Sequence, residues 1–384
     1  IVFDKTGTIT EGKPSVEEIK VFEGDKSDVL IKIGSLNQNS EHPLASAIVN
    51  FVQEKEMDLN KVEEFESITG KGVKGIVMDV RDNGGGSLKT VVDIAGLFIE
   101  QGPIVQIKSA EGKKEVLFDR DAKVQWDGPL VVMINEFSAS ASEILAAAIQ
   151  DYKRGVIVGS KQSYGKGTVQ NLYDLNQFIR GGTYGDLGAL KTTTQKYYRI
   201  NGGSTQREGV KSDVVMADKY AYLKMGEKDV ENAMPWDKID AANYKVWDKQ
   251  HNYDLAIAQS KARLENNSQM QLIEDNAKWL EKRNNENVYS LQIDKFKAEQ
   301  KALDETNKKY KPITDYKNSL VFSSLPYENE MVKNDALLKE KRDRWHESLS
   351  KDLYIEEALH ILNDMNFGKK EVTNKVTKEK MVKS

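Results

Sequence analysis

Three short loops in the middle of the chain hold the residue types that could carry out acyl transfer. They are a Gly-Gly-Gly run at residues 84–86, a Ser-Ala-Ser-Ala-Ser run at residues 138–142 and a Gly-Lys-Gly-Thr run at residues 165–168. A serine hydroxyl can act as a nucleophile beside a base, and backbone N–H groups can stabilise the oxyanion that forms. A nucleophile at Ser140 would also lie at the N-terminus of a helix, where developing negative charge is favoured.

The elements around these loops alternate between strands and helices. We expect buried strands at residues 74–80, 130–134 and 156–158, a helix after the glycine loop, and an Ala-rich helix that Gly155 closes. This order is typical of α/β units with parallel strands. If the strands are parallel, the three loops leave from their carboxyl ends, where open α/β sheets place their functional sites.

Each of the three loops also has an explanation without chemistry. Ser140 and Glu143 have the spacing of a capping box, which would start a helix without any catalysis. The glycine run could be an ordinary flexible turn. Lys166 is one of 56 lysines and arginines, most of which are solvated side chains. The residue types alone therefore leave both interpretations open.

In combination, the three loops resemble those of the carboxyl-terminal processing, or tail-specific, serine proteases. The resemblance continues through the runs at residues 190–196 and 198–206 and extends from about residue 73 to the end of the chain. It implies a serine endopeptidase that cleaves near protein C-termini. It also implies an α/β protease core of the ClpP/crotonase-like type, here incomplete, at residues 73–215, followed by a mostly α-helical C-terminal domain at residues 216–384. We expect the PDZ domain of this family to be absent.

The same resemblance assigns roles to individual residues. Ser140 is the implied nucleophile, and Lys166 is the implied general base, which later protonates the leaving amine. Gln170 would orient the lysine, one helical turn further on if that segment is helical. Gly86 and Ala141 would supply the N–H groups of the oxyanion hole. The resemblance implies no cofactor, protein or peptide substrates with accessible C-termini, and a location in the periplasm or cell envelope.

Two further points follow from the chemistry of this dyad. Lysine can act as a base only when it is neutral, so the role of Lys166 requires a pKa well below the usual value of about 10.4. Asp151 stands at the spacing of an acidic residue that is sometimes implicated in the family. We expect Asp151 to have a structural role instead of a catalytic one.

The N-terminal segment, residues 1–72, resembles a different family. Its Asp-Lys-Thr-Gly-Thr run is the phosphorylation motif of P-type ATPases, and later residues resemble an α+β fragment of the nucleotide-binding domain of the heavy-metal branch. We therefore expect a chimera, and ATP and Mg²⁺ are cofactors only under this alternative. The implied phosphoryl acceptor is Asp4, and the implied nucleotide-binding residues are His42, Glu66, Gly70 and Gly72. A third alternative is a catalytically silent chimera of the two families.

Composition excludes several other classes of function. The chain has no cysteine, and its 4 histidines form no pair at ligand spacing, so we expect no metal site. A net charge of -4 gives no reason to expect nucleic acid as a partner. No apolar run is long enough to cross a bilayer, and no signal-peptide pattern is present. Because the chain opens on Ile1, we expect it to be a fragment at that end.

Overall fold

The computed structural model divides the chain into two compact units, Ile1–Gly72 and Val73–Ser384. In the first unit, the described part consists of helix α1 (Lys26–Asn37) and a short helical stretch at residues 49–53. The second unit holds all the remaining elements. The residues that the structure describes are 25–37, 49–55, 57, 74–178, 185–248, 252–333 and 335–365.

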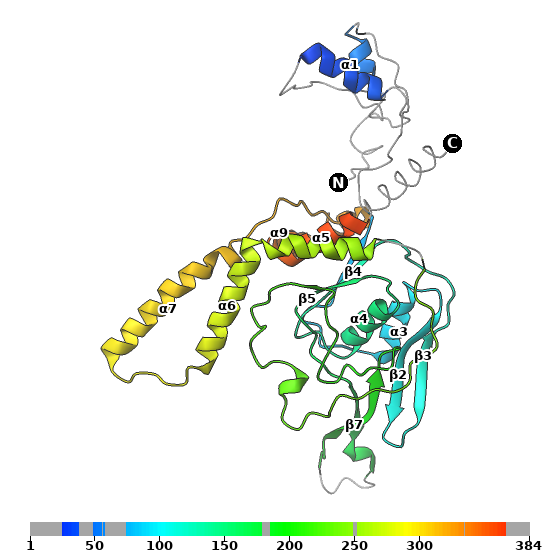
Figure 1. Cartoon of the computed structure of the whole chain (residues 1–384), viewed down its shortest axis with the longest axis vertical. Helices are drawn as coiled ribbons and strands as arrows, with labels where there is room; N and C mark the ends of the chain where they lie inside the picture. The colour runs from blue at the N-terminus through cyan, green and yellow to red at the C-terminus, as the bar shows by residue number, and fades with distance from the viewer. Residues whose placement is uncertain are drawn as a thin grey trace, which may run out of the picture. The chain divides into compact units, whose positions relative to one another are not determined.

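A parallel sheet forms the centre of the second unit (Figure 1). Its strand order is β1-β4-β5-β8, and every neighbouring pair is parallel. The predicted strands and their parallel pairing are confirmed, and the helices α3 (Leu88–Gly96) and α4 (Ala141–Asp151) follow the glycine and serine loops. The strands are β1 (Ile76–Asp79), β4 (Leu130–Ile134), β5 (Val156–Gly159) and β8 (Val214–Val215).

A second, antiparallel sheet carries the lysine loop. Its order is β3-β2-β7-β6, and it was not predicted from the sequence. Strand β6 starts at Thr168, so Gln170 lies on a strand and the helical turn considered for this segment is wrong. The strands are β2 (Gly102–Ser109), β3 (Lys114–Asp119), β6 (Thr168–Asp174) and β7 (Ala189–Tyr198).

Strand β4 is buried on both of its faces, which explains its unbroken apolar sequence. Successive side chains of a strand point to opposite faces of the sheet. Leu130, Val132 and Ile134 therefore pack in one core with α3 and α4. Val131 and Met133 pack in a second core with helices of the C-terminal region. The C-terminal region is thus the cover of one sheet face, without which that face would be exposed to water.

Long helices occupy most of the C-terminal region. Figure 1 shows α6 and α7 as two long helices in yellow-green and yellow. The two helices are in contact through Trp279 of α6 and Tyr310 of α7, whose ring centres lie 5.7 Å apart. Residues 353–365 are also helical and contribute much of the second core. The helices are α5 (Tyr253–Glu265), α6 (Ser268–Asn285), α7 (Ile293–Thr314), α8 (Pro326–Val332) and α9 (Ala336–Ser350).

Helix α4 ends at Asp151, close to its expected end, but the residue that takes the left-handed conformation after it is Lys153, with φ 51°, instead of Gly155. Between β8 and α5, the described residues form no long helix and instead bond to the sheet-containing core. For example, the N–H of Ala242 donates to the carbonyl of Ile200 at 2.8 Å. The helices of the C-terminal region therefore begin later in the chain than residue 216.

The second core makes a prediction about stability. Ile361 is fully buried in that core, so Ile361→Ala should lower the free energy of unfolding by about 2–4 kcal/mol, as large-to-small core substitutions do. Leu337 on α9 is 59% exposed, so Leu337→Ala is the matched control and should change it by less than about 0.5 kcal/mol. Urea unfolding measures both. Equal losses in the two variants would show that the C-terminal helix does not cover the sheet.

Candidate functional site

One cleft of about 280 Å³ brings the residues from the three loops together. It lies where the serine loop, the glycine loop and the start of β6 meet, and no single element provides all of its lining. The sequence-predicted residues that line it are Gly86, Ser140, Ala141, Lys166 and Gln170. All five predicted residues of the protease site therefore share one surface hollow.

Ser140 has an unusual backbone conformation at the start of α4. Its φ is 57° and its ψ is -115°, a combination that costs a residue with a side chain about 1–3 kcal/mol. The Ser140 side chain makes no capping hydrogen bond, because the N–H of Glu143 donates to the backbone carbonyl of Ser140 at 2.9 Å. The capping-box explanation therefore accounts for Glu143 but not for the Ser140 hydroxyl.

Lys166 contacts the glutamine predicted to orient it. Its amine donates to Gln170 Oε1 at 3.3 Å. Lys166 lies just before strand β6, and Gln170 lies on that strand. Among the hydrogen bonds of the described residues, none joins the Lys166 amine to the Ser140 hydroxyl. The two side chains line the same cleft.

Glu143 connects the serine loop to the lysine loop. Its carboxylate accepts hydrogen bonds from the N–H of Ser140 at 2.8 Å, the hydroxyl of Ser163 at 2.6 Å, and the N–H groups of Gly165 at 2.7 Å and Lys166 at 3.0 Å. The side chain is fully buried. Burial raises the pKa of Glu143 to about 7, although the hydrogen bonds act in the opposite direction. The sequence indicated only its place in a capping box.

Tyr197 and Thr205 hold the other side of the Lys166 backbone. The Tyr197 hydroxyl donates to the Lys166 carbonyl, and the Thr205 hydroxyl donates to the same carbonyl at 3.1 Å. Burial raises the pKa of Tyr197 well above its usual value, so the phenol stays protonated and remains a donor. Tyr197 comes from β7, which lies far from Lys166 in the sequence, and no pattern pointed to it.

The glycine loop approaches Ser140 closely at one position. Gly85 has φ 105°, and a Cβ there would lie 2.7 Å from Ser140 Cβ. Gly84 and Gly86 have open space around them, so Gly86 lines the cleft without needing to be glycine for steric reasons. The Ala141 N–H is among the first in α4, which lack acceptors within the helix. It is available to a ligand in the cleft.

Asp151 lies at the opposite end of α4 from Ser140. A helix of 11 residues is about 16 Å long, which places this carboxylate outside the cleft. It forms an ion pair with Arg199 at 2.5 Å and accepts a hydrogen bond from Asn201 at 2.7 Å. Its contacts are those of a structural residue.

The residues of the ATPase alternative lie outside the described part of the chain, and their roles stay predictions. They are Asp4, His42, Glu66, Gly70 and Gly72. Within the described ranges, no group of three or more His, Asp or Glu side chains is arranged to hold a metal ion. A search of the same ranges found no helix with the length and apolar character needed to cross a membrane.

Two family models match adjoining parts of the chain. Residues 45–216 match peptidase family S41, and residues 220–366 match the C-terminal domain of tail specific protease (DUF3340). The part of the chain that holds the cleft is therefore similar to peptidase family S41. The S41 match begins before Val73 and includes Glu66, Gly70 and Gly72, for which the resemblance to a P-type ATPase implied nucleotide binding.

Two curated relatives each match less than half of the chain. The tail-specific protease of Haemophilus influenzae is 48% identical over 171 residues, which are 44% of this chain and 24% of that protein. The carboxy-terminal-processing protease of Bartonella bacilliformis is 35% identical over 172 residues, which are 44% of this chain and 37% of that protein. The chain therefore spans well under half the length of these two relatives.

Among solved structures, a photosystem II D1 C-terminal processing protease is similar. It is 28% identical, with a TM-score of 0.33, and the match covers 47% of this chain and 40% of that one.

The close approach of Gly85 to Ser140 predicts the effect of adding a single methyl group. Gly85→Ala should lower the free energy of unfolding by about 1–3 kcal/mol and displace Ser140, because the new Cβ meets both strain and a steric clash. Gly84→Ala is the matched variant, with no atom within 4 Å of its Cβ, and should leave that free energy nearly unchanged. Thermal unfolding of both variants tests this. A Gly85→Ala protein as stable as Gly84→Ala would contradict the geometry.

The raised pKa of Glu143 predicts a pH dependence of stability. The folded state holds the proton up to about pH 7, whereas the ordinary value of the carboxyl is 4.5. The free energy of unfolding should therefore fall as the pH rises through that interval. Glu143→Gln should make this fall smaller. Part of it should remain, because burial and Asp218 raise the pKa of Glu136 to about 7 as well.

Urea unfolding at several pH values between 4 and 8 measures this fall. Glu111→Gln, which changes an exposed carboxyl, is the control and should behave as the unmodified chain does. A fall of the same size in Glu143→Gln as in the unmodified chain would mean that Glu143 is not the group that titrates.

Proposed function

We propose that this chain carries the catalytic core of a serine endopeptidase of the carboxyl-terminal processing type. The observation that supports this most directly is the convergence of Ser140, Lys166, Gly86 and Ala141 in one cleft. The match of residues 45–216 to the model of peptidase family S41 supports the reaction class. The Ser140 hydroxyl, which has no capping role, is the nucleophile in this proposal.

The proposed reaction has two steps. The Ser140 hydroxyl attacks the carbonyl carbon of the scissile peptide, and its proton passes to the neutral Lys166 amine. The N–H groups of Gly86 and Ala141 stabilise the oxyanion. Lys166 then gives the proton to the leaving amine, which breaks the C–N bond and leaves an acyl group on Ser140. In the second step, water gives a proton to Lys166 and attacks the ester carbonyl. Lys166 then returns this proton to the Ser140 oxygen as the C–O bond to the acyl group breaks, which releases the carboxylic acid and the free serine.

The contacts around Lys166 fit this proposal. Gln170 binds the amine directly and limits where it can point. Glu143 and Tyr197 bind the lysine's backbone instead, on its N–H and carbonyl sides. These two contacts fix the backbone from which the Lys166 side chain extends. None of the three contacts places a carboxylate on the amine. Such rigid support is what a catalytic pair needs to keep its geometry.

The substrate, location and fold family are parts of the same proposal. We infer protein or peptide substrates with accessible C-termini, a ClpP/crotonase-like core, a location in the periplasm or cell envelope, and no cofactor for the protease. The names of the relatives, which refer to tail-specific and carboxy-terminal processing, support the substrate class. No observation on the described residues favours an ATP-dependent function of the N-terminal segment or a catalytically silent chimera.

Cleavage of an unfolded protein substrate tests the proposed dyad. Ser140→Ala and Lys166→Ala should each lower kcat by about 10³-fold or more, because each removes a group that reacts directly. Lys123→Ala, which changes an exposed lysine outside the cleft, should cleave as the unmodified chain does. Activity of Ser140→Ala equal to that of the unmodified chain would overturn the proposal.

A further inference from the structure

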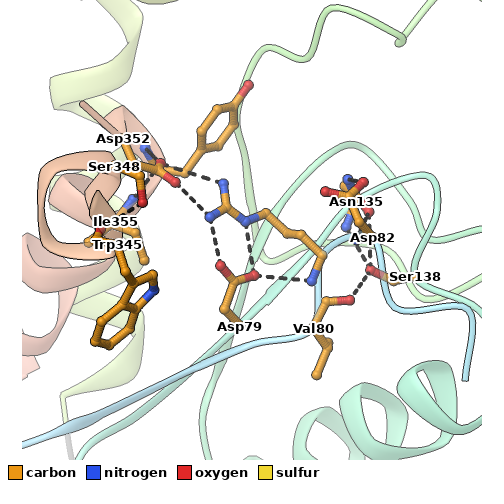
Figure 2. Close-up of polar contacts among 11 residues, drawn as sticks. Asp79, Val80, Asp82, Asn135, Ser138, Trp345, Ser348, Asp352 and Ile355 are labelled. Atoms are coloured by element: carbon orange, nitrogen blue, oxygen red, sulfur yellow. Dashed lines mark hydrogen bonds and ion pairs between the residues drawn. The ribbon is translucent and has the colours of Figure 1, made fainter. Parts of the chain in front are cut away.

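Arg81 joins the protease core to the C-terminal helical region. Its guanidinium binds Asp79 through Nε at 2.9 Å and through a terminal nitrogen at 2.6 Å, and it binds Asp352 Oδ2 at 2.7 Å. It also lies over the ring of Tyr354, with 5.3 Å to the ring centre. Figure 2 shows Asp79 and Asp352 on two sides of this guanidinium. The planar fork of arginine suits such a double contact.

Arg81 also lies near the start of the loop that carries the glycines, two residues after the end of β1. The loop is attached to the serine loop just after Arg81, because the N–H of Asp82 donates to Asn135 Oδ1 at 2.9 Å and Asn135 donates back to Asp82 Oδ1 at 2.8 Å. Figure 2 shows Asp82, Asn135 and Ser138 together on the side away from Asp352. The glycine loop is therefore held by the serine loop on one side and by the helical region, through Arg81, on the other.

Asp352 has a second contact that makes it a rigid partner. Its Oδ1 accepts hydrogen bonds from the N–H groups of Tyr354 at 2.9 Å and Ile355 at 3.1 Å, which caps the helix at residues 353–365. That helix packs against the parallel sheet through residues such as Ile361. A single carboxylate thus connects a helix fixed on the core to the arginine near the start of the glycine loop.

We propose that Asp352 is a positioning residue for the oxyanion hole and acts through Arg81. This inference rests on the proposed protease function, and it makes the helical region part of what sets the reaction rate. Oxyanion donors must lie close to their ideal distance from the reacting oxygen. Small displacements of catalytic groups cost rate even when they originate far from the reaction. The ion pair removes one direction in which the glycine loop could shift.

Asp352→Asn separates this role from simple stability. Asparagine keeps the helix cap, because it is as good an N-cap as aspartate, but it removes the charge that binds Arg81. Arg81 keeps Asp79 as a partner, so the substitution leaves no unpaired guanidinium. Asp364→Asn is the matched control. Asp364 binds Arg263 at 2.7 Å, and Arg263 likewise keeps a second partner, Glu357, at 2.7 Å.

The experiment compares both variants with the unmodified full chain in peptide cleavage, urea unfolding and hydrogen exchange of the backbone amides at residues 82–86. Asp352→Asn should lower kcat by about tenfold to a hundredfold, with KM changed by less than about twofold, and should speed exchange in that loop. Asp364→Asn should lose a similar amount of stability, with kcat and loop exchange close to those of the unmodified chain. Equal kcat values and equal loop exchange in the two variants would overturn the inference.

The two proposals fail in different ways. If the unmodified chain shows no cleavage that depends on Ser140, the protease function fails, and exchange at residues 82–86 alone decides whether Asp352 holds the loop. Should Asp352→Asn not fold, Arg81→Lys takes its place, because lysine keeps the charge but cannot bind two carboxylates with a planar fork. That variant should show a smaller change in the same direction. No change in either kcat or exchange would contradict the inference.

Discussion

The buried carboxylate of Glu143 is the interaction on which the candidate site depends. It accepts hydrogen bonds from the backbone of Ser140 and from that of Lys166, whose loops follow different strands of the sheet. Away from water such bonds are stronger, and leaving their donors unpaired costs more. Both loops are therefore held in one arrangement by a single side chain. The hydrogen bond from the Ser140 N–H to the Glu143 carboxylate helps to hold Ser140 in its unusual backbone conformation.

The second constraint is the double burial of strand β4. One set of its side chains packs against α3 and α4, and the other packs against the C-terminal helices, so the strand has no face left for water. The loop that leaves this strand carries Ser140. Because the C-terminal helices cover the same sheet and bind Arg81 through Asp352, the helical region and the site share their support. The position of the helical region on the sheet therefore affects the geometry of the glycine loop.

The sequence predicted the parts of the site that depend on local patterns. Apolar runs followed by glycine or serine loops indicated the strands β1, β4 and β5 and the helices after them, because strand and helix periodicity extend over a few residues only. The spacing of Ser140 and Glu143 also predicted a helix start, but the capping box did not show which atoms would bond. Only the three-dimensional structure shows that the hydroxyl takes no part in it.

The parts that could not be predicted depend on pairing between distant segments. Strand β6 pairs with β7, and this pairing makes the lysine segment a strand even though a helix was considered. The contact of Tyr197 with the Lys166 carbonyl follows from the same sheet. Lys153 adopts a left-handed conformation that glycine usually occupies, so Gly155, the residue with the stronger local signal, was expected to end the helix instead. For β6 and Tyr197, pairing with a distant strand outweighs local preference.

The measurement that tests the central claim most directly is the site of covalent modification by a fluorophosphonate, a reagent that reacts with activated serine nucleophiles. After reaction with the full chain, proteolysis and mass spectrometry identify the modified residue. The Ser140–Lys166 account predicts an adduct on Ser140 that is strongly reduced in Lys166→Ala. An adduct on a different serine, or labelling of Ser140 at the same rate without Lys166, would contradict it.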